Sequence, residues 1–203
     1  MSAAVKLATR PLGKNGPLVP SIGLGLMSLS SAHGMPKPDA ERLVFLDKAY
    51  EIGETFWDTG ALYVDLYYLY RLDKVTPVEK TMAALAKLKR IEYSAFSLDI
   101  EAPEHTLLLT YRELGIAVVA YSPLGKGMLG SAIRSVSDVS KPGNIRTAFA
   151  PRFSPQNLEA NLALVNKLAE IASYKGLLAY GDDIFPIPGM RNPKRLAENL
   201  GAL

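Results

Sequence analysis

The chain of 203 residues contains no cysteine, which excludes disulfide bonds, thiol nucleophiles and thiolate metal ligands. It has only two histidines, His33 and His105, and two isolated imidazoles make a poor metal site. No run of about eighteen apolar residues occurs, so no membrane span is expected. The amino terminus lacks the apolar stretch of a secretory signal. We therefore expect a cytoplasmic protein without a metal centre.

An excess of charge of one sign is also missing. The formal net charge is +3, and the 23 basic residues are mixed with the 20 acidic ones rather than gathered in blocks. Nucleic-acid-binding proteins concentrate lysine and arginine on one face, so nucleic acid is not an expected partner. Of the residues of the chain, 48% are hydrophobic and 21% are charged, and this composition is typical of a soluble globular fold. We expect a single domain over residues 1–203.

Strand-like and helix-like segments alternate along the chain, which predicts βαβ units and an α/β fold with a parallel sheet. Leu43, Leu46 and Tyr50 recur at helical spacing, and residues 116–121 form the apolar, β-branched run of a buried parallel strand. Periodicity alone does not distinguish an open sheet from a barrel. The six expected strands are Ser21–Met27, Glu54–Asp58, Val64–Tyr70, Ile91–Phe96, Ile116–Tyr121 and Ile184–Ile187, and the five expected helices are Asp39–Ile52, Pro77–Lys89, Glu104–Leu114, Pro155–Tyr174 and Pro193–Leu203.

Three joints between these segments are too short for the pattern. Only Thr59–Tyr63 separates two of the expected strands, whereas a parallel crossover needs roughly ten to twelve residues. The helix that ends at Lys89 runs into the next strand almost without a loop, and the apolar stretch after Gly176 is too short for a helix. Either a strand–helix unit is missing at each joint, or the joints form a hairpin and two tight loops.

Two positions beside the first joint are candidates for acid–base chemistry. Asp58 ends an expected strand and Tyr63 lies on the following loop, so a carboxylate and a phenol would face the mouth of an α/β fold. A tyrosine, whose pKa is about 10, serves as a general acid near neutral pH only when a nearby cation lowers that pKa. The plain alternative is a buried aspartate that caps a loop and a tyrosine that packs at the rim.

A glycine-containing loop follows the apolar strand and reads YSPLGKG from Tyr121 to Gly127. Its glycines, beginning with Gly125, would let the backbone approach a phosphate closely. The ring of Tyr121 would be placed to stack on a flat cofactor ring. Taken alone the signal is weak, since most loops of this kind are only turns.

The last strand is followed by a glycine turn at Gly189 and by a helix with several cations in its first turns, Arg191 and Arg195 among them. Helix amino termini favour acidic side chains, so this placement is locally unfavourable and a bound phosphate would relieve it. Arg195, Glu198 and Asn199 share one face by their spacing, which suits a phosphorylated ribose and an adenine edge. The alternative is a solvated, basic start of a helix.

In their order, these segments resemble the aldo-keto reductase superfamily, especially its microbial and fungal branch near the pyridoxal reductases. Members of that family have a (β/α)₈ TIM-barrel-type fold. They transfer hydride from NADPH to an aldehyde or ketone, and they bind the cofactor without a Rossmann fold. The resemblance implies this barrel, NADPH/NADP as cofactor and a small-molecule carbonyl substrate. The matching segments are Gly23–Met27, Trp57–Tyr63, Asp65–Asp73, Ile91–Phe96, Ala120–Leu129 and Ile187–Leu203.

The resemblance also implies roles for individual residues. Asp58 and Tyr63 would be two members of the family's catalytic tetrad, with Tyr63 as the proton donor to the carbonyl oxygen. The implied cofactor contacts are Tyr121 on the nicotinamide, Ser122, Leu124 and Gly125 along the pyrophosphate, Arg195 at the 2′-phosphate, and Glu198 and Asn199 at the adenine.

The sequence departs from the family at three places. The tetrad lysine has no counterpart, Tyr70 stands where most members have the tetrad histidine, and Arg90 replaces a glutamine that contacts the carboxamide. These departures coincide with the short joints, which favours missing segments and an incomplete barrel of about six strands. Without the lysine and histidine, Tyr63 has no evident means of lowering its pKa.

Three functions fit these features. The leading hypothesis is an NADP-dependent aldo-keto reductase that reduces aldehydes or ketones to alcohols with impaired activity. The second is a non-catalytic NADPH-binding or regulatory protein on the same scaffold. The third is a partial product without function.

Overall fold

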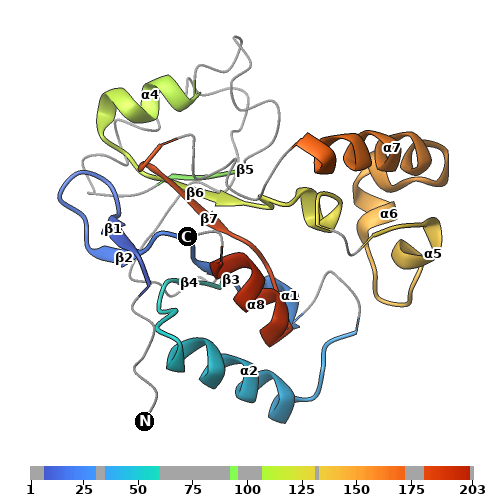
Figure 1. Ribbon diagram of the computed structural model, residues 1–203, viewed down its shortest axis with the longest axis horizontal. Coiled ribbons are helices and arrows are strands. Elements are labelled where there is room, and N and C mark those ends of the chain that lie inside the picture. The colour runs from blue at the N-terminus through green and yellow to red at the C-terminus, as the bar shows by residue number, and fades with distance from the viewer. Residues whose placement is uncertain are drawn as a thin grey trace.

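The computed structural model describes residues 7–30, 35–59, 92–95, 107–130, 133–171 and 181–201. Figure 1 shows short strands at the centre, the helices α2 and α8 beside one part of them, and the helices α5 to α7 to one side. No helix in these ranges is long and apolar enough to cross a membrane. The strands are β1 (Thr9–Pro11), β2 (Leu18–Pro20), β3 (Leu24–Gly25), β4 (Trp57–Asp58), β5 (Glu92–Ala95), β6 (Val118–Tyr121) and β7 (Ile184–Ile187). The α-helices are α1 (Met27–Ser30), α2 (Asp39–Glu51), α4 (Leu107–Leu114), α5 (Val136–Val139), α6 (Arg146–Phe149), α7 (Pro155–Ile171) and α8 (Pro193–Leu200), and the 3₁₀ helices are η1 (Gly125–Gly127) and η2 (Pro151–Phe153).

Five of the described strands form one parallel array. Strand β6 pairs in parallel with β5 on one side and with β7 on the other, and β3 pairs in parallel with β4. The two groups meet where the amide of Gly23 donates to the carbonyl of Pro186 at 2.8 Å and Gly25 forms a parallel bridge with Gly189. The order is therefore β4–β3–β7–β6–β5, which confirms the α/β fold predicted from the sequence.

One face of this array carries an apolar cluster, the inner cluster. The ring of Phe56 meets the ring of Phe185 edge to face, with centroids 6.2 Å apart and an interplanar angle of 88°. A Cβ atom at Gly23 would lie only 2.6 Å from Cδ1 of Phe56, so the ring rests on bare backbone there. The members of the inner cluster are Leu12, Phe56, Ala117, Val119, Phe185 and Ile187.

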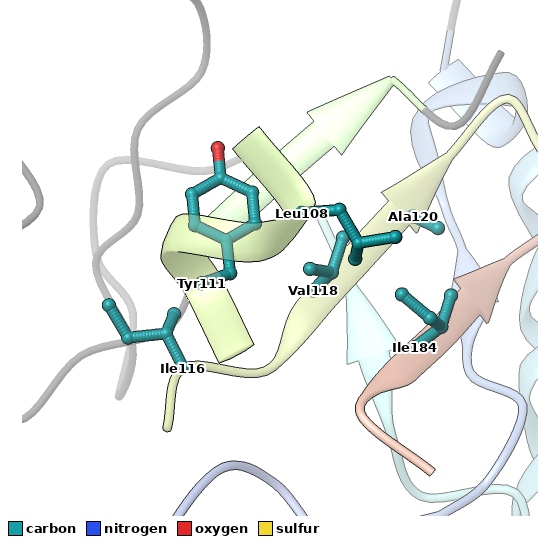
Figure 2. Packing of buried hydrophobic residues seen from close by; sticks show 6 residues of the cluster. All are labelled: Leu108, Tyr111, Ile116, Val118, Ala120 and Ile184. Atoms are coloured by element: carbon teal, nitrogen blue, oxygen red, sulfur yellow. The ribbon is translucent and has the colours of Figure 1, made fainter. Parts of the chain in front are cut away.

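Successive side chains of a strand point to opposite sides of the sheet, so the strands also present apolar residues on the face opposite the inner cluster. Helices cover that opposite face. In β6, Val119 belongs to the inner cluster, whereas Val118 and Ala120 pack under α4 (Figure 2). Helices α2 and α8 cover β3 in the same way through a second apolar cluster. That cluster consists of Leu24, Leu29, Phe45, Ala49, Met190 and Leu196.

An antiparallel hairpin of β1 and β2 covers the amino ends of the central strands. It inserts Leu12 into the inner cluster and places the guanidinium of Arg10 4.5 Å from the centre of the Phe185 ring. Arg10 also donates to the carbonyl oxygens of Gly181 and Ser21, each at 3.2 Å. Burial lowers the pKa of Arg10, and these acceptors and the ring compensate for its lost hydration.

The chain between β6 and the end of α7 has an apolar core of its own. Phe153 and Leu158 are fully buried there, and Met128 joins them from the residue after η1. This packing fixes residues 133–158 beside the carboxyl end of β6. The remaining members of the core are Ile133, Val139 and Ala150.

Most of the expected elements inside the described ranges are confirmed. Helix α2 begins at the expected Asp39, α7 at Pro155 and α8 at Pro193, and β7 has the expected bounds. Three expected strands are too long: Ser21–Met27 is reduced to Leu24–Gly25 and Met27 begins a helix, Glu54–Asp58 is reduced to Trp57–Asp58, and Ile116–Tyr121 is reduced to Val118–Tyr121. The expected strand Val64–Tyr70 and helix Pro77–Lys89 lie outside the described residues.

Candidate functional site

The carboxyl ends of four parallel strands meet at one edge of the array. Gly25 of β3 is in register with Asp58 of β4, and Tyr121 of β6 is in register with Ile187 of β7. The bridge from Gly25 to Gly189 joins the two halves of this edge. Parallel α/β folds place their binding and catalytic groups at this end of the strands, so the edge is the candidate site.

Asp58 lies at this edge as its sequence position predicts. It is buried, and its carbonyl oxygen accepts a hydrogen bond from the amide of Leu26 at 2.8 Å. Asp58 follows Phe56 by two residues, so it points to the same face of β4 as the inner cluster. Tyr63, the second expected catalytic residue, lies outside the described residues, so the structure places only the carboxylate.

The loop after β6 has a strained backbone. Ser122 has a φ of 53°, and Gly125, Lys126 and Gly127 follow with φ values of 58°, 58° and 92°. The left-handed region is unfavourable for residues with a Cβ atom, and such strain concentrates at binding and catalytic sites. Tyr121 packs against the inner cluster at the start of this loop. Consecutive turns of this kind form backbone concavities that accept anions, as the sequence led us to expect.

The turn after β7 brings the second group of expected residues to the neighbouring strand end. Gly189 is exposed, and a Cβ atom there would lie 3.5 Å from the hydroxyl of Ser28. Asn192 caps α8, because its side-chain oxygen accepts from the amide of Lys194 at 2.8 Å. Arg191 is partly buried beside this turn and donates to the carbonyl of Met35 at 3.3 Å.

On α8, the three expected residues share one face. The guanidinium of Arg195 pairs with the carboxylate of Glu198 at 3.2 Å, and the amide of Asn199 donates to the sulfur of Met190 at 3.8 Å. Both members of the ion pair are more than one third exposed, so the pair is open to solvent and contributes little to stability. A phosphate could therefore compete for Arg195 at low cost.

Sequence reasoning missed one cation at this site, Arg146 of α6. Its Nε donates to the carbonyl of Lys126 at 2.8 Å, and its Nη2 lies 3.6 Å from where a Cβ atom of Gly127 would be. Burial, and after it the positive charge of Arg191, lowers the pKa of Arg146. Nothing in the sequence pattern connects Arg146 with Arg191, because they are 45 positions apart in separate segments.

Together these groups have the donor set of a phosphate site. The guanidinium of Arg146 lies beside a glycine-containing loop with left-handed backbone, and after burial the positive charge of Arg191 contributes to the lowered pKa of Arg146. A guanidinium is the preferred side chain for phosphate recognition, and a bound anion would compensate this unfavourable placement. The residues present therefore fit a ligand with several phosphate groups and a flat ring near Tyr121.

A cavity of about 760 Å³ opens at the opposite end of the strands. Four of its charged groups form ion pairs, with Arg112 at 2.8 Å from Asp183 and Arg10 at 3.3 Å from Asp182. In parallel α/β barrels this amino-terminal end serves stability. We therefore place the candidate site at the carboxyl edge and not in this cavity.

Comparison with known proteins gives concordant results. The Aldo/keto reductase family profile matches residues 90–203. The aldo-keto reductase yakc [NADP(+)] of Schizosaccharomyces pombe is 30% identical over 302 residues, which cover 98% of this chain and 87% of that protein. The aldo-keto reductase str7 of Strobilurus tenacellus is 29% identical over 296 residues, which cover 97% of this chain and 87% of that protein. Both alignments exceed the 203 residues of this chain, so both relatives have internal stretches without a counterpart here.

A solved structure shows the same fold. A thermostable aldo-keto reductase in complex with the inhibitor epalrestat matches with a TM-score of 0.55 and 17% sequence identity. The match covers 97% of this chain and 94% of that one. The fold is thus that of the (β/α)₈ barrel, and the five parallel strands described here form an arc of it. The barrel type expected from the sequence is confirmed, and the strands of the described residues are consistent with an incomplete barrel.

Proposed function

Because this chain belongs to the aldo/keto reductase family, we propose that it binds NADPH and reduces small aldehydes or ketones to alcohols at a low rate. The observation that carries the proposal is the strained loop of η1, beside which Arg146 is held by the 2.8 Å bond from its Nε to the carbonyl of Lys126. A relative that is 30% identical over nearly all of this chain bears NADP(+) in its name, which supports the same cofactor. We further propose that residues 1–203 act as one barrel domain in the cytoplasm.

The cofactor would lie across the carboxyl ends of β6 and β7. Its nicotinamide would stack on Tyr121, and its pyrophosphate would run along the loop that begins there, toward Arg146. The 2′-phosphate would draw Arg195 away from Glu198. The other proposed contacts are Ser122, Leu124, Gly125, Gly189, Arg191 and Asn199.

Bound NADPH supplies the hydride for carbonyl reduction, and the chain must supply a proton. We propose that Tyr63 donates this proton to the carbonyl oxygen and that Asp58, buried at the end of β4, orients the proton donor. An unassisted tyrosine with a pKa of about 10 remains protonated at neutral pH but releases its proton reluctantly. The tetrad lysine and histidine have no counterpart in the sequence, so we expect turnover to be slow.

Turnover tests the catalytic half of this proposal. Oxidation of NADPH is followed with a panel of aliphatic and aromatic aldehydes for the native chain and for Tyr63→Phe. We expect slow turnover by the native chain and a rate roughly a hundredfold lower for Tyr63→Phe, the usual contribution of a general acid. Equal rates for the two proteins would contradict a catalytic role for Tyr63.

The second candidate function is NADPH binding without catalysis. It is favoured by Tyr70, which stands where most family members have the tetrad histidine, and by the missing lysine. Saturable NADPH binding with no turnover above the Tyr63→Phe background would support this function. A melting transition that is neither cooperative nor raised by NADPH would instead indicate a partial product.

A further inference from the structure

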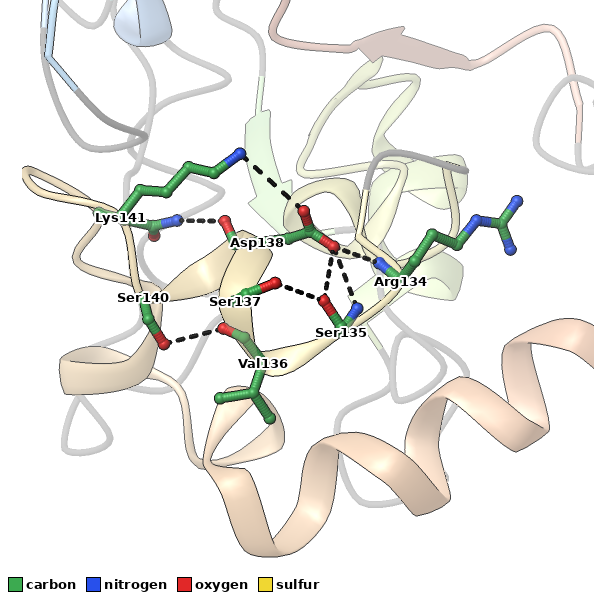
Figure 3. Close-up of polar contacts among 8 residues, drawn as sticks. Arg134, Ser135, Val136, Ser137, Asp138, Ser140 and Lys141 are labelled. Atoms are coloured by element: carbon green, nitrogen blue, oxygen red, sulfur yellow. Dashed lines mark hydrogen bonds and ion pairs between the residues drawn. The ribbon is translucent and has the colours of Figure 1, made fainter.

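Residues 134–141 are tied together by a capping box at the start of α5 (Figure 3). The amides of Arg134 and Ser135 donate to Oδ2 of Asp138 at 3.0 and 3.1 Å, and the hydroxyl of Ser135 adds a third contact at 3.1 Å. These donors, the Arg134 amide first, lower the pKa of Asp138. The carboxylate therefore holds the backbone of α5 in place at neutral pH, although it is partly exposed to solvent.

Asn144 connects this capped turn to α6. Its Nδ2 donates to the carbonyl of Asp138 at 3.4 Å, and its Oδ1 accepts from the amide of Arg146 at 3.1 Å. The half-buried side-chain amide of Asn144 thus forms hydrogen bonds through both its nitrogen and its oxygen, in the short link between the four-residue helices α5 and α6. An asparagine that accepts from the amide two residues later fixes a local turn, so Asn144 sets the direction in which Arg146 leaves the backbone.

The position of the Arg146 side chain is unfavourable unless neighbouring groups hold it there. The guanidinium is partly desolvated, and this burial, followed by the positive charge of Arg191, lowers the pKa of Arg146. Its Nε–H bond to the carbonyl of Lys126 is one compensation in the structure. A long, flexible side chain in such a place would turn toward water unless the backbone beneath it were held.

We propose that Asn144 is a positioning residue that sets the affinity for the phosphates of the cofactor through Arg146, without touching the cofactor. The chain of contacts runs from Asp138 through Asn144 to Arg146 and on to Lys126, which joins the α5 turn to the strained loop after β6. This inference rests on the proposed function, because it assumes that the anion bound by Arg146 is a phosphate of NADPH.

A double-mutant cycle in the full chain tests the proposal. NADPH dissociation constants are measured by fluorescence titration for the native protein, Asn144→Ala, Arg146→Ala and the double variant. Asn144→Ala alone should weaken binding roughly five- to tenfold, the effect of one or two net hydrogen bonds. The double variant should bind no more weakly than Arg146→Ala alone, because Asn144 acts only through that arginine.

Two further variants separate positioning from general damage to the fold. Asn144→Ser keeps an oxygen for the Arg146 amide and should recover most of the affinity. Asn157→Ala removes a similar contact nearby, a 3.0 Å bond to the carbonyl of Pro151, and should leave NADPH binding unchanged. If Asn157→Ala weakens binding as much as Asn144→Ala does, the effect is structural and the proposal is wrong.

The remaining outcomes distinguish this inference from the proposed function. Loss of affinity in Arg146→Ala together with native affinity in Asn144→Ala would overturn only the role of Asn144. Full additivity of the two substitutions would overturn it as well. Absence of NADPH binding by the native chain would instead remove the proposed function, and this inference with it.

Discussion

Glu54 is a buried carboxyl group at the start of the segment that leads into β4. Its Oε1 accepts from the amide of Phe56 at 2.8 Å, whereas its Oε2 has no hydrogen-bond partner. Burial raises the pKa of Glu54 from its ordinary value of 4.5 to about 7, and the Phe56 amide offsets only part of this effect. The folded protein therefore binds a proton here that the unfolded chain releases near pH 4.5.

This shift predicts a pH-dependent stability. Between pH 4.5 and about 7 the folded state holds more protons than the unfolded state, so the free energy of unfolding should fall as the pH rises. The loss should approach about 3 kcal/mol above pH 7. Glu54→Gln should flatten this slope in urea denaturation at pH 5 and pH 8, while the exposed Glu159→Gln should keep it. A slope that survives in Glu54→Gln would show that another group titrates.

Arg195 provides a prediction about cofactor choice. We expect Arg195→Ala to weaken NADPH binding by about tenfold or more, because a charge-assisted bond to the 2′-phosphate is lost. Binding of NADH, which lacks this phosphate, should change less than twofold. Arg152→Ala, which removes an exposed arginine of η2, is the matched control for charge. Equal losses of affinity for NADPH and NADH would show that Arg195 contacts a part of the cofactor other than the 2′-phosphate.

At the scale of single elements, the close contact of β3 with its neighbours depends on Gly23. A Cβ atom there would lie 2.6 Å from Phe56 Cδ1, 2.8 Å from the Phe56 carbonyl and 2.9 Å from Cγ2 of Ile187. Gly23→Ala should therefore destabilise the protein by about 2–3 kcal/mol, as overpacking of a core does. In Gly130→Ala the nearest atom would be an ordinary 3.7 Å away, so this variant should stay near native stability. Denaturation midpoints of the two variants measure the difference.

The regular elements were predictable because their signals are local. Strand β7 follows from continuous apolar sequence, and α2 begins where it was expected. The residues whose spacing predicted α2 are not those that it buries, since Leu43 and Tyr50 are exposed and Phe45 and Ala49 are buried. The hairpin of β1 and β2 was missed, since each strand has three residues and includes a proline. Helices α5 and α6 were missed for a related reason. Each has only four residues and depends on the contacts of Ser135, Asp138 and Asn144 rather than on an apolar pattern.

The candidate site was only partly predictable for the same reason. Glycines after a strand and cations at a helix start are visible in the sequence, and they led to Tyr121, Gly189 and Arg195. Arg146 stands in a segment without a readable pattern, and only folding brings it to the carbonyl of Lys126 in the loop after β6. A site built across neighbouring strand ends is set by tertiary structure, so its cross-chain contacts cannot be derived from local spacing.

At the scale of the whole molecule, the chain retains one continuous side of a barrel. The parallel order β4–β3–β7–β6–β5 joins the strand that carries Asp58 to the strands whose ends carry Tyr121 and Gly189. Its relatives carry further internal stretches, and the resemblance leads us to expect no counterpart of the tetrad lysine and histidine in this sequence. Because the strand ends proposed to bind the cofactor are present and two tetrad residues are expected to be missing, we expect cofactor binding to be better preserved than catalysis.

The central proposal is that NADPH binds across the carboxyl ends of β6 and β7, with its nicotinamide on Tyr121 at the edge of the strands that also carries Asp58. Trp57 is the single tryptophan of the chain and stands next to that residue, so its emission reports on this place. We predict that NADPH quenches the emission of Trp57 in a saturable titration, through energy transfer to the reduced nicotinamide, and that Arg146→Ala shifts the curve to higher concentrations. Tryptophan emission that stays unchanged up to millimolar NADPH would contradict the claim.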